Sequence, residues 1–276
     1  MRVAMVAVMV VGLTTGCARP SYTLTLEPVP DSSHLIIHTA TDVGDLLLWL
    51  PEAIATERGF SSIYPRGEWR IEGQAARQDV GAADLFKPGN FQISEHSVEC
   101  AGIRVPREAP VSWTARAQVQ GDRVRFALIV RNEGSETLRS VGAPICLKFL
   151  RGQVWSPEQV HARAAGQVRA LDQLGDVAGK VPGFEAYLLC GRTYPNRFYE
   201  EFWGFNPNCV DEPELVTDCP TAGVRVGIRA RRAVFVHANR LNPCTDVMLD
   251  LGDLEPGASA SAEGVVWLEP IVRSIR

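Results

Sequence analysis

Net charge, lysine and long apolar runs are all scarce in this sequence. Its 276 residues include 28 basic and 32 acidic side chains, which leaves a net charge of −4. The only lysines are Lys87, Lys148 and Lys180, a compositional bias that indicates no function by itself. A chain without excess positive charge has little attraction for phosphates, so we expect no nucleic-acid partner. The apolar run Val3–Leu13 is shorter than the roughly 20 residues of a membrane-spanning helix, which argues against a permanent transmembrane anchor.

Several motifs that carry chemistry are also missing. The sequence has no C-x-x-C pair, which argues against a zinc ribbon and a thioredoxin-like site. It has no G-x-S-x-G elbow, no H-E-x-x-H, no phosphate-binding P-loop and no dinucleotide fingerprint. We therefore expect no cofactor and no metal. These absences do not bear on an enzyme that gathers its catalytic residues from distant strands.

The pattern that is present is mostly that of β-strands. Apolar and polar residues alternate over 111–119 and again over 123–131, and Gly121-Asp122 between them is typical of a hairpin turn. Further strands are expected around 22–26, 35–38, 138–150, 224–229 and 258–268. The 138–150 stretch fits either a strand pair or one bent strand. Many short strands separated by turn residues predict an all-β fold, an antiparallel β-sandwich in one domain over 17–276.

Helical signals are few, and one long segment fits neither pattern. Ser156-Pro157-Glu158 is a good helix start, but Gly166 interrupts the helical pattern, so 156–174 is either one helix or a turn and a hairpin. Residues 46–57 are a weaker helix candidate because Pro51 shortens them. We expect one or two short helices in all. Residues 175–219, rich in cysteine and aromatic residues, are predicted to form a long insertion over one end of the sandwich.

The first residues have the parts of a secretory signal peptide: one early positive charge, an apolar core and small residues where cleavage would occur. Leu13-Thr14-Thr15-Gly16-Cys17 resembles the bacterial lipobox, in which the cysteine is lipidated and becomes the first mature residue. The resemblance covers only these positions, and Thr14 departs from the usual leucine. It implies a signal peptide over 1–16, a lipid anchor on Cys17 and a periplasm-facing or outer-membrane lipoprotein of the cell envelope. The alternative is an ordinary secretory signal with a cysteine near its end.

The remaining six cysteines fit an exported protein, because export places them in an oxidising compartment. Up to three disulfides are expected, and fifteen connectivities are open. We predict that Cys209 and Cys219 staple the loop between them. A set of reduced, buried thiols is the alternative.

The densest candidate site lies in the predicted insertion. Aromatic rings can stack on sugar faces while nearby carboxylates bond hydroxyls, and a concave mixture of the two is typical of a small-molecule site. The candidate ligand-binding residues are Tyr194, Tyr199, Glu201, Trp203 and Asp211. The alternative is a satellite core beneath a disulfide-bonded loop. The acids of this segment show no spacing that specifies a hydrolytic pair, so no catalytic residue is assigned.

Histidines offer two weaker candidates. His34 and His38 share a face of a strand but would lie about 13 Å apart, too far to bind one ion together. The polar residues His237, Asn239, Asn242, Cys244 and Asp246 surround a predicted turn at Asn242-Pro243. There we expect side chains bonding to nearby backbone, in preference to metal binding or catalysis.

The body also resembles a known group of folds. The run 124–134 and the later turn Leu254-Glu255-Pro256-Gly257 are similar to strand–turn sequences of bacterial surface β-sandwiches and of the galactose-mutarotase-like supersandwich. This resemblance implies a fold only, and no mutarotase catalytic residue can be matched to it. The sequence therefore predicts an exported lipoprotein whose β-sandwich binds a glycan or another envelope ligand. The alternatives are a carbohydrate-active hydrolase or epimerase, and a non-catalytic envelope scaffold.

Overall fold

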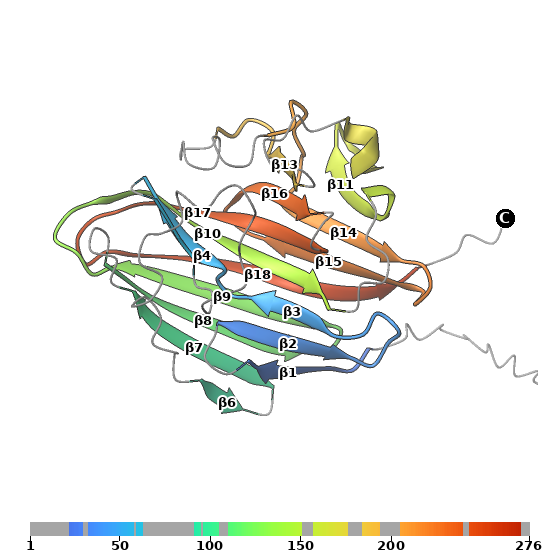
Figure 1. The fold of residues 1–276 in the computed structure, drawn as a ribbon, viewed down its shortest axis with the longest axis horizontal. Coiled ribbons are helices and arrows are strands. Elements are labelled where there is room, and N and C mark those ends of the chain that lie inside the picture. Colours follow the sequence, from blue (N-terminus) through green and yellow to red (C-terminus); the bar gives the residue numbers. More distant parts are fainter. Residues whose placement is uncertain are drawn as a thin grey trace, which may run out of the picture.

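The computed structural model describes residues 22–29, 33–57, 59–62, 91–94, 96–104, 110–150, 157–175, 184–193, 205–239 and 243–271. These residues form two antiparallel β-sheets that lie against each other (Figure 1). The predicted all-β sandwich is therefore confirmed. No helix among these residues is long and apolar enough to cross a bilayer.

The first sheet is ordered β1-β2-β3-β10-β17-β16-β13. Strand β4 extends it beside β10, and β5 pairs with β4. The strands are β1 (Leu24–Pro28), β2 (His34–Thr39), β3 (Leu46–Trp49), β4 (Ala53–Thr56), β5 (Gly59–Ser62), β10 (Leu138–Phe149), β13 (Phe184–Leu188), β16 (Ala233–Asn239) and β17 (Cys244–Leu254). Strands far apart in the sequence therefore become neighbours at β3, β10 and β17.

The second sheet is ordered β12-β11-β14-β15-β18-β9-β8-β7-β6. Two short 3₁₀ helices, η2 (Pro157–Gln159) and η3 (Leu171–Leu174), flank its β11–β12 hairpin. The strands are β6 (Gln92–Ser94), β7 (Ser97–Arg104), β8 (Val111–Gln120), β9 (Arg123–Asn132), β11 (Val160–Ala164), β12 (Gln167–Ala170), β14 (Glu214–Cys219), β15 (Val224–Ala230) and β18 (Ser259–Pro270).

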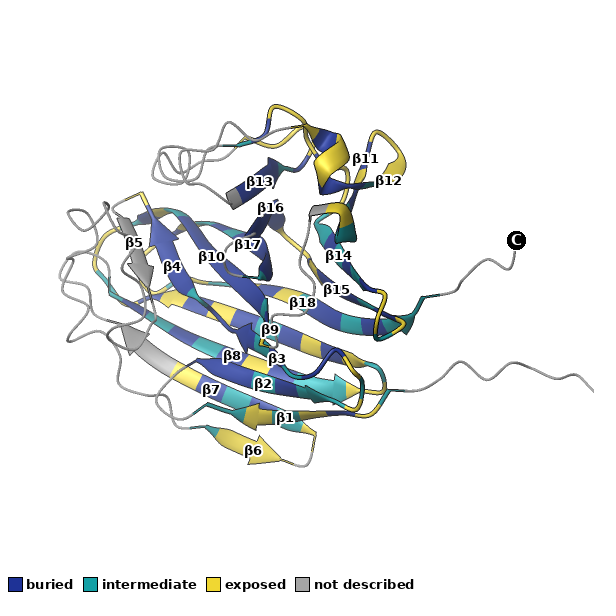
Figure 2. Cartoon of the chain, turned by 45° about the vertical axis from the view of Figure 1, so that its right-hand side comes forward, coloured by how far each residue is buried: buried dark blue, intermediate teal, exposed yellow. Residues whose placement is uncertain are grey.

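One apolar core fills the space between the sheets. Alternate residues of β10, such as Ile145 and Leu147, contribute to it from the first sheet, and Phe126 and Leu128 of β9 contribute from the second. All four side chains are buried. Figure 2 shows the central strands as mostly buried and the edge strand β6 as exposed. Because side chains alternate along a strand, the other residues of β10, β16 and β17 face away from this core.

The hairpin predicted around Gly121-Asp122 is confirmed. Strands β8 and β9 pair in register from Val111 opposite Asn132 to Gln120 opposite Arg123. Gly121 has a φ of +63°, a conformation that glycine adopts without the steric cost that other residues incur. The predicted strands near 22–26, 35–38, 224–229 and 258–268 are also present as β1, β2, β15 and β18.

Residues 46–57 do not form the predicted helix. They form β3 and β4, separated by the cis peptide bond between Leu50 and Pro51. The side chains of Leu46 and Leu48 enter the core while the backbone of β3 pairs with β2 and β10. Tertiary pairing on both sides of β3 therefore overrides the helical propensity of its leucines.

The two alternatives for 156–174 resolve in favour of a turn and a hairpin. After η2, strands β11 and β12 pair around Ala165 and Gly166, whose φ values are +51° and +75°. Two successive residues with positive φ make a tight hairpin turn, so the helix cannot continue through them.

The 138–150 stretch is one bent strand. β10 shifts register against β17 between Leu138 and Gly142, and Ser140 has a φ of +52°. The predicted 175–219 insertion is less separate than expected. Within it, β13 belongs to the first sheet and β14 to the second.

Candidate functional site

A row of polar and aromatic side chains crosses the outer face of the first sheet. The register places His34 of β2 opposite Trp49 of β3, and Trp49 opposite Cys146 of β10. Cys146 lies opposite Asp246 of β17, and Asp246 lies opposite His237 of β16. Residues directly opposite on neighbouring strands share a face, so the five side chains form one line across five strands. All five are buried.

One end of this row is an aromatic stack. The rings of His34 and Trp49 lie 4.7 Å apart between centroids, with an interplanar angle of 11°. Nζ of Lys148 lies 5.9 Å from the centroid of a Trp49 ring. Burial first, and then the nearby Lys148 charge, lowers the pKa of His34 to about 4. His34 is therefore neutral at pH 7, which suits an imidazole stacked beside a cation.

The other end of the row is a histidine–carboxylate pair. Nδ1 of His237 lies 2.9 Å from Oδ2 of Asp246, a hydrogen-bond distance. The two side chains are only 5% and 9% exposed. A carboxylate bonded to one ring nitrogen fixes the orientation and tautomer of an imidazole, so that Nε2 is the atom able to exchange a proton with another group.

Two thiols lie between the two ends. Sγ of Cys146, Sγ of Cys244 and a carboxylate oxygen of Asp246 all lie within 4.8 Å of one another. Burial raises the pKa of Cys146 well above its usual range. A hydrogen bond with Cys146 lowers the pKa of Cys244, but burial and the charge of Asp246 outweigh it and raise that pKa to about 12. Both groups are therefore neutral thiols at pH 7.

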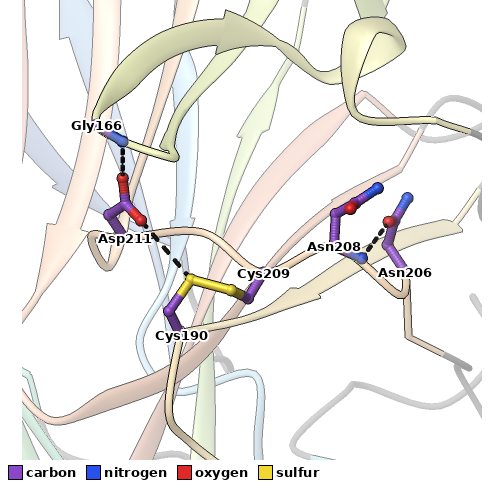
Figure 3. Close-up of a disulfide and its surroundings, with 6 residues drawn as sticks. All are labelled: Gly166, Cys190, Asn206, Asn208, Cys209 and Asp211. Atoms are coloured by element: carbon purple, nitrogen blue, oxygen red, sulfur yellow. Dashed lines mark hydrogen bonds between the residues drawn. A yellow bond between two sulfur atoms is a disulfide. The ribbon is translucent and has the colours of Figure 1, made fainter.

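Most of the residues predicted to bind a ligand lie outside the described structure. These are Tyr194, Tyr199, Glu201 and Trp203, and the predicted lipidation site Cys17 is also outside it. Asp211 is described, and its side chain contacts the backbone of a neighbouring turn. Its Oδ2 accepts a hydrogen bond of 2.7 Å from the backbone N–H of Gly166, which holds the β11–β12 turn (Figure 3).

The predicted pairing of Cys209 with Cys219 is wrong. Cys209 forms a disulfide with Cys190, whereas Cys219 is a buried free thiol at the end of β14. The chain enforces this choice, because Leu189 and Val210 form a parallel bridge that brings the neighbouring Cys190 and Cys209 together. Oδ1 of Asp211 lies 3.6 Å from Sγ of Cys190 (Figure 3). A disulfide sulfur carries no proton, so this is a polar contact and not a hydrogen bond.

Two asparagines beside the disulfide are also occupied by the backbone. Asn206 donates from Nδ2 to the carbonyl of Gly175 at 3.0 Å, and Asn208 donates to that of Leu174 at 2.6 Å. The backbone N–H of Asn208 donates to Oδ1 of Asn206 at 2.8 Å (Figure 3). These bonds satisfy carbonyls at the end of η3, so both amides stabilise the loop.

The histidines behave differently from each other. On β2, His38 is half-buried, with Nε2 2.8 Å from Glu27 and Nδ1 3.2 Å from Asp45. Hydrogen bonding to these carboxylates raises the pKa of His38. In contrast, His237 and Asp246 bond each other across β16 and β17. Asn242 lies outside the described residues.

The row was not predicted as a unit because its members lie on five separate strands. A signal was nevertheless present. His237 lies between apolar residues in β16, and Asp246 immediately precedes the apolar run of β17, although both strands are buried around them. A titratable side chain at an alternating position inside a buried strand calls for a partner on the neighbouring strand.

No family model matches the chain, and no curated protein matches it. Solved structures do match. The protein Slr1438 from Synechocystis sp. PCC 6803 has a TM-score of 0.50 at 10% identity, over 92% of this chain and 96% of its own. A putative aldose 1-epimerase from Escherichia coli has a TM-score of 0.49 at 13% identity, over 90% and 100%. A putative mutarotase from Salmonella typhimurium has a TM-score of 0.44 at 10% identity, over 90% and 94%. At such low identity the likeness concerns the fold alone, so the chain shares its overall architecture with Slr1438.

Proposed function

We propose that this protein acts on a carbohydrate, as an aldose epimerase, at the outer face of its first sheet. The observation that carries the proposal is the buried His237–Asp246 pair, placed in one row with the His34–Trp49 stack. The choice of sugars as the substrate class is consistent with a sandwich of the galactose-mutarotase-like kind.

The reaction that suits such a pair is the interconversion of sugar anomers. The anomeric hydroxyl loses its proton, the bond from the anomeric carbon to the ring oxygen breaks, and the ring oxygen receives a proton. Closure on the other face reverses these steps. An imidazole accepts and donates protons near neutral pH, so His237 is the proposed proton carrier and Asp246 the residue that positions it. Both are nearly fully buried, so a sugar reaches them only if side chains over this face move.

The test is the rate of anomer interconversion of freshly dissolved α-D-glucose, α-D-galactose and α-D-xylose, followed by polarimetry. We expect the protein to accelerate at least one of them, and His237→Gln to lower kcat/KM by about 10²- to 10⁴-fold. The matched control is His38→Gln, which removes a half-buried histidine with two carboxylate partners from the same sheet. No acceleration on the panel, or equal losses in both variants, contradicts the proposal.

Glycan binding without catalysis is the second candidate. The segment that contains Tyr194, Tyr199, Glu201 and Trp203 is fastened at both ends by the Cys190–Cys209 disulfide. A loop closed by a disulfide has less conformational entropy to lose when it binds a ligand. Such a loop suits a segment that recognises a ligand. A glycan array with the wild type and Trp203→Ala tests this candidate. Binding lost in the variant supports it, and no binding to any envelope or environmental glycan refutes it.

Export and lipidation at Cys17 are a further proposal, which rests on the lipobox-like residues alone. A disulfide such as Cys190–Cys209 is typical of proteins in oxidising compartments and is consistent with export. We expect fatty-acid label on the wild type and none on Cys17→Ala, with the wild type in the membrane fraction of a bacterial host. Unlabelled wild type contradicts the proposal.

A further inference from the structure

Apart from any carbohydrate activity, we propose that Cys146, Cys244 and Asp246 bind one zinc ion on the outer face of the first sheet. The three side chains are buried, and they supply two thiol sulfurs and a carboxylate oxygen. These donor atoms all lie within 4.8 Å of one another. The proposal does not depend on the epimerase activity, because it concerns binding of the metal alone.

The strand register explains why the three donors meet. Cys146 of β10 lies directly opposite Asp246 of β17. Cys244 lies two residues before Asp246 on β17, so both side chains leave the strand on the same face. Strand β17 is held by β10 on one side and by β16 on the other, so its backbone positions are fixed.

The spacing and the chemistry both suit zinc. Metal distances of about 2.3 Å to sulfur and 2.0–2.2 Å to oxygen in a tetrahedral site place ligand atoms about 3.5–3.8 Å apart. Since the donor atoms lie within 4.8 Å of one another, the closure needed is at most about 1 Å, which side-chain rotation can supply. Sulfur donors select zinc over magnesium and calcium. Three protein ligands leave the fourth position of the ion open.

Asp246 provides a second, independent observation. Its Oδ2 is bonded to His237, its Oδ1 is buried without a full hydrogen bond, and the Cys244 thiol is the weak donor beside this carboxylate. Buried carboxylate oxygens are normally satisfied, so this atom calls for a cation or a donor. The bond from His237 to the other oxygen would also orient Asp246 as a ligand, as partners behind metal ligands commonly do.

A disulfide between the two thiols is less suited to this geometry. Cys146 and Cys244 are diagonal neighbours, since Cys244 lies opposite Lys148. Diagonal positions lie about 7–8 Å apart, beyond the usual span of a disulfide. Lys148 shares the face with the thiols and would offset the excess negative charge of two thiolates and a carboxylate around a divalent ion.

The deciding experiment is zinc titration of the reduced, chelator-treated full-length protein, followed by dialysis and metal analysis. We expect about one zinc per chain. X-ray absorption of the loaded wild type should show two sulfurs at about 2.3 Å and oxygen or nitrogen at about 2.0 Å. This measurement needs no variant, so it holds even if a substitution prevents folding. A chain that retains no zinc, or a zinc shell without sulfur, overturns the proposal.

Variants locate the ion. Cys146→Ser and Cys244→Ser should weaken zinc binding by at least about 100-fold, and His237→Gln by about 10- to 100-fold. The matched control is Cys219→Ser, which removes a buried free thiol of the second sheet and should still bind one zinc. Equal loss in the control overturns the assignment. So does a Cys146–Cys244 disulfide in the unreduced protein together with no zinc uptake by the reduced protein.

Discussion

Removing the Cys190–Cys209 disulfide should lower the free energy of unfolding by about 3 kcal/mol. The two cysteines are 19 residues apart, and closing a loop of that length in the unfolded chain costs about this much in lost entropy. The backbone bonds beside the bridge, from Cys190 N to Val210 O and from Val210 N to Leu188 O, do not replace this effect. They break on unfolding, whereas the disulfide restrains the unfolded chain.

The assay is urea unfolding and differential scanning calorimetry of the double variant Cys190→Ala/Cys209→Ala beside the wild type. A loss of about 3 kcal/mol corresponds to a Tm lowered by about 6–12 °C in a domain of this size. Dithiothreitol should reproduce the loss in the wild type and have no effect on the double variant. In Cys219→Ala, the sensitivity to reductant should remain. A loss below about 1 kcal/mol, or a peptide map that joins Cys209 to Cys219, would refute the reasoning.

Three further outcomes test other parts of the fold. The lowered pKa of His34 means that the unfolded state binds more protons between pH 4 and 6.5, so stability should be highest above pH 6.5 and fall by up to about 3 kcal/mol as the pH approaches 4. Denaturation midpoints measured against pH should fall in this way in the wild type but not in His34→Phe, which keeps a ring in the stack. The same pH dependence in the variant counts against the role of His34. Gly264→Ala should cost about 1–3 kcal/mol, because its Cβ would lie 2.1 Å from Cζ of Phe126, and Phe126→Leu should recover part of the loss in a double-mutant cycle. Asn132→Ala should lower the free energy of unfolding by about 1–3 kcal/mol, because the buried carbonyl of Leu254 loses the 2.8 Å hydrogen bond from Nδ2 of Asn132. Equal urea midpoints for wild type and variant would show that this hydrogen bond does not stabilise the fold.

Strands with one apolar face could be predicted from single segments. In β8 and β9 the alternation and the Gly121 turn are both local, and the structure confirms the hairpin residue by residue. The helix expected over 46–57 failed for the opposite reason. The leucines there are local helix formers, but the backbone hydrogen bonds are made to β2 and β10, the latter about 100 residues away.

The cysteine pairing shows the same limit on a smaller scale. Sequence proximity favoured Cys219 as the partner of Cys209, but Cys219 belongs to β14 and its thiol is buried in the core. The partner was decided by the bridge between Leu189 and Val210, which no local pattern indicates.

The sequence by itself determined the fold class, the main strands and several turns, because alternation and turn residues act over a few neighbouring positions. Only the tertiary structure decided that His34, Trp49, Cys146, Asp246 and His237 form one row. That row depends on the order and register of five strands, which are fixed by packing two whole sheets against a shared core and not by any segment alone.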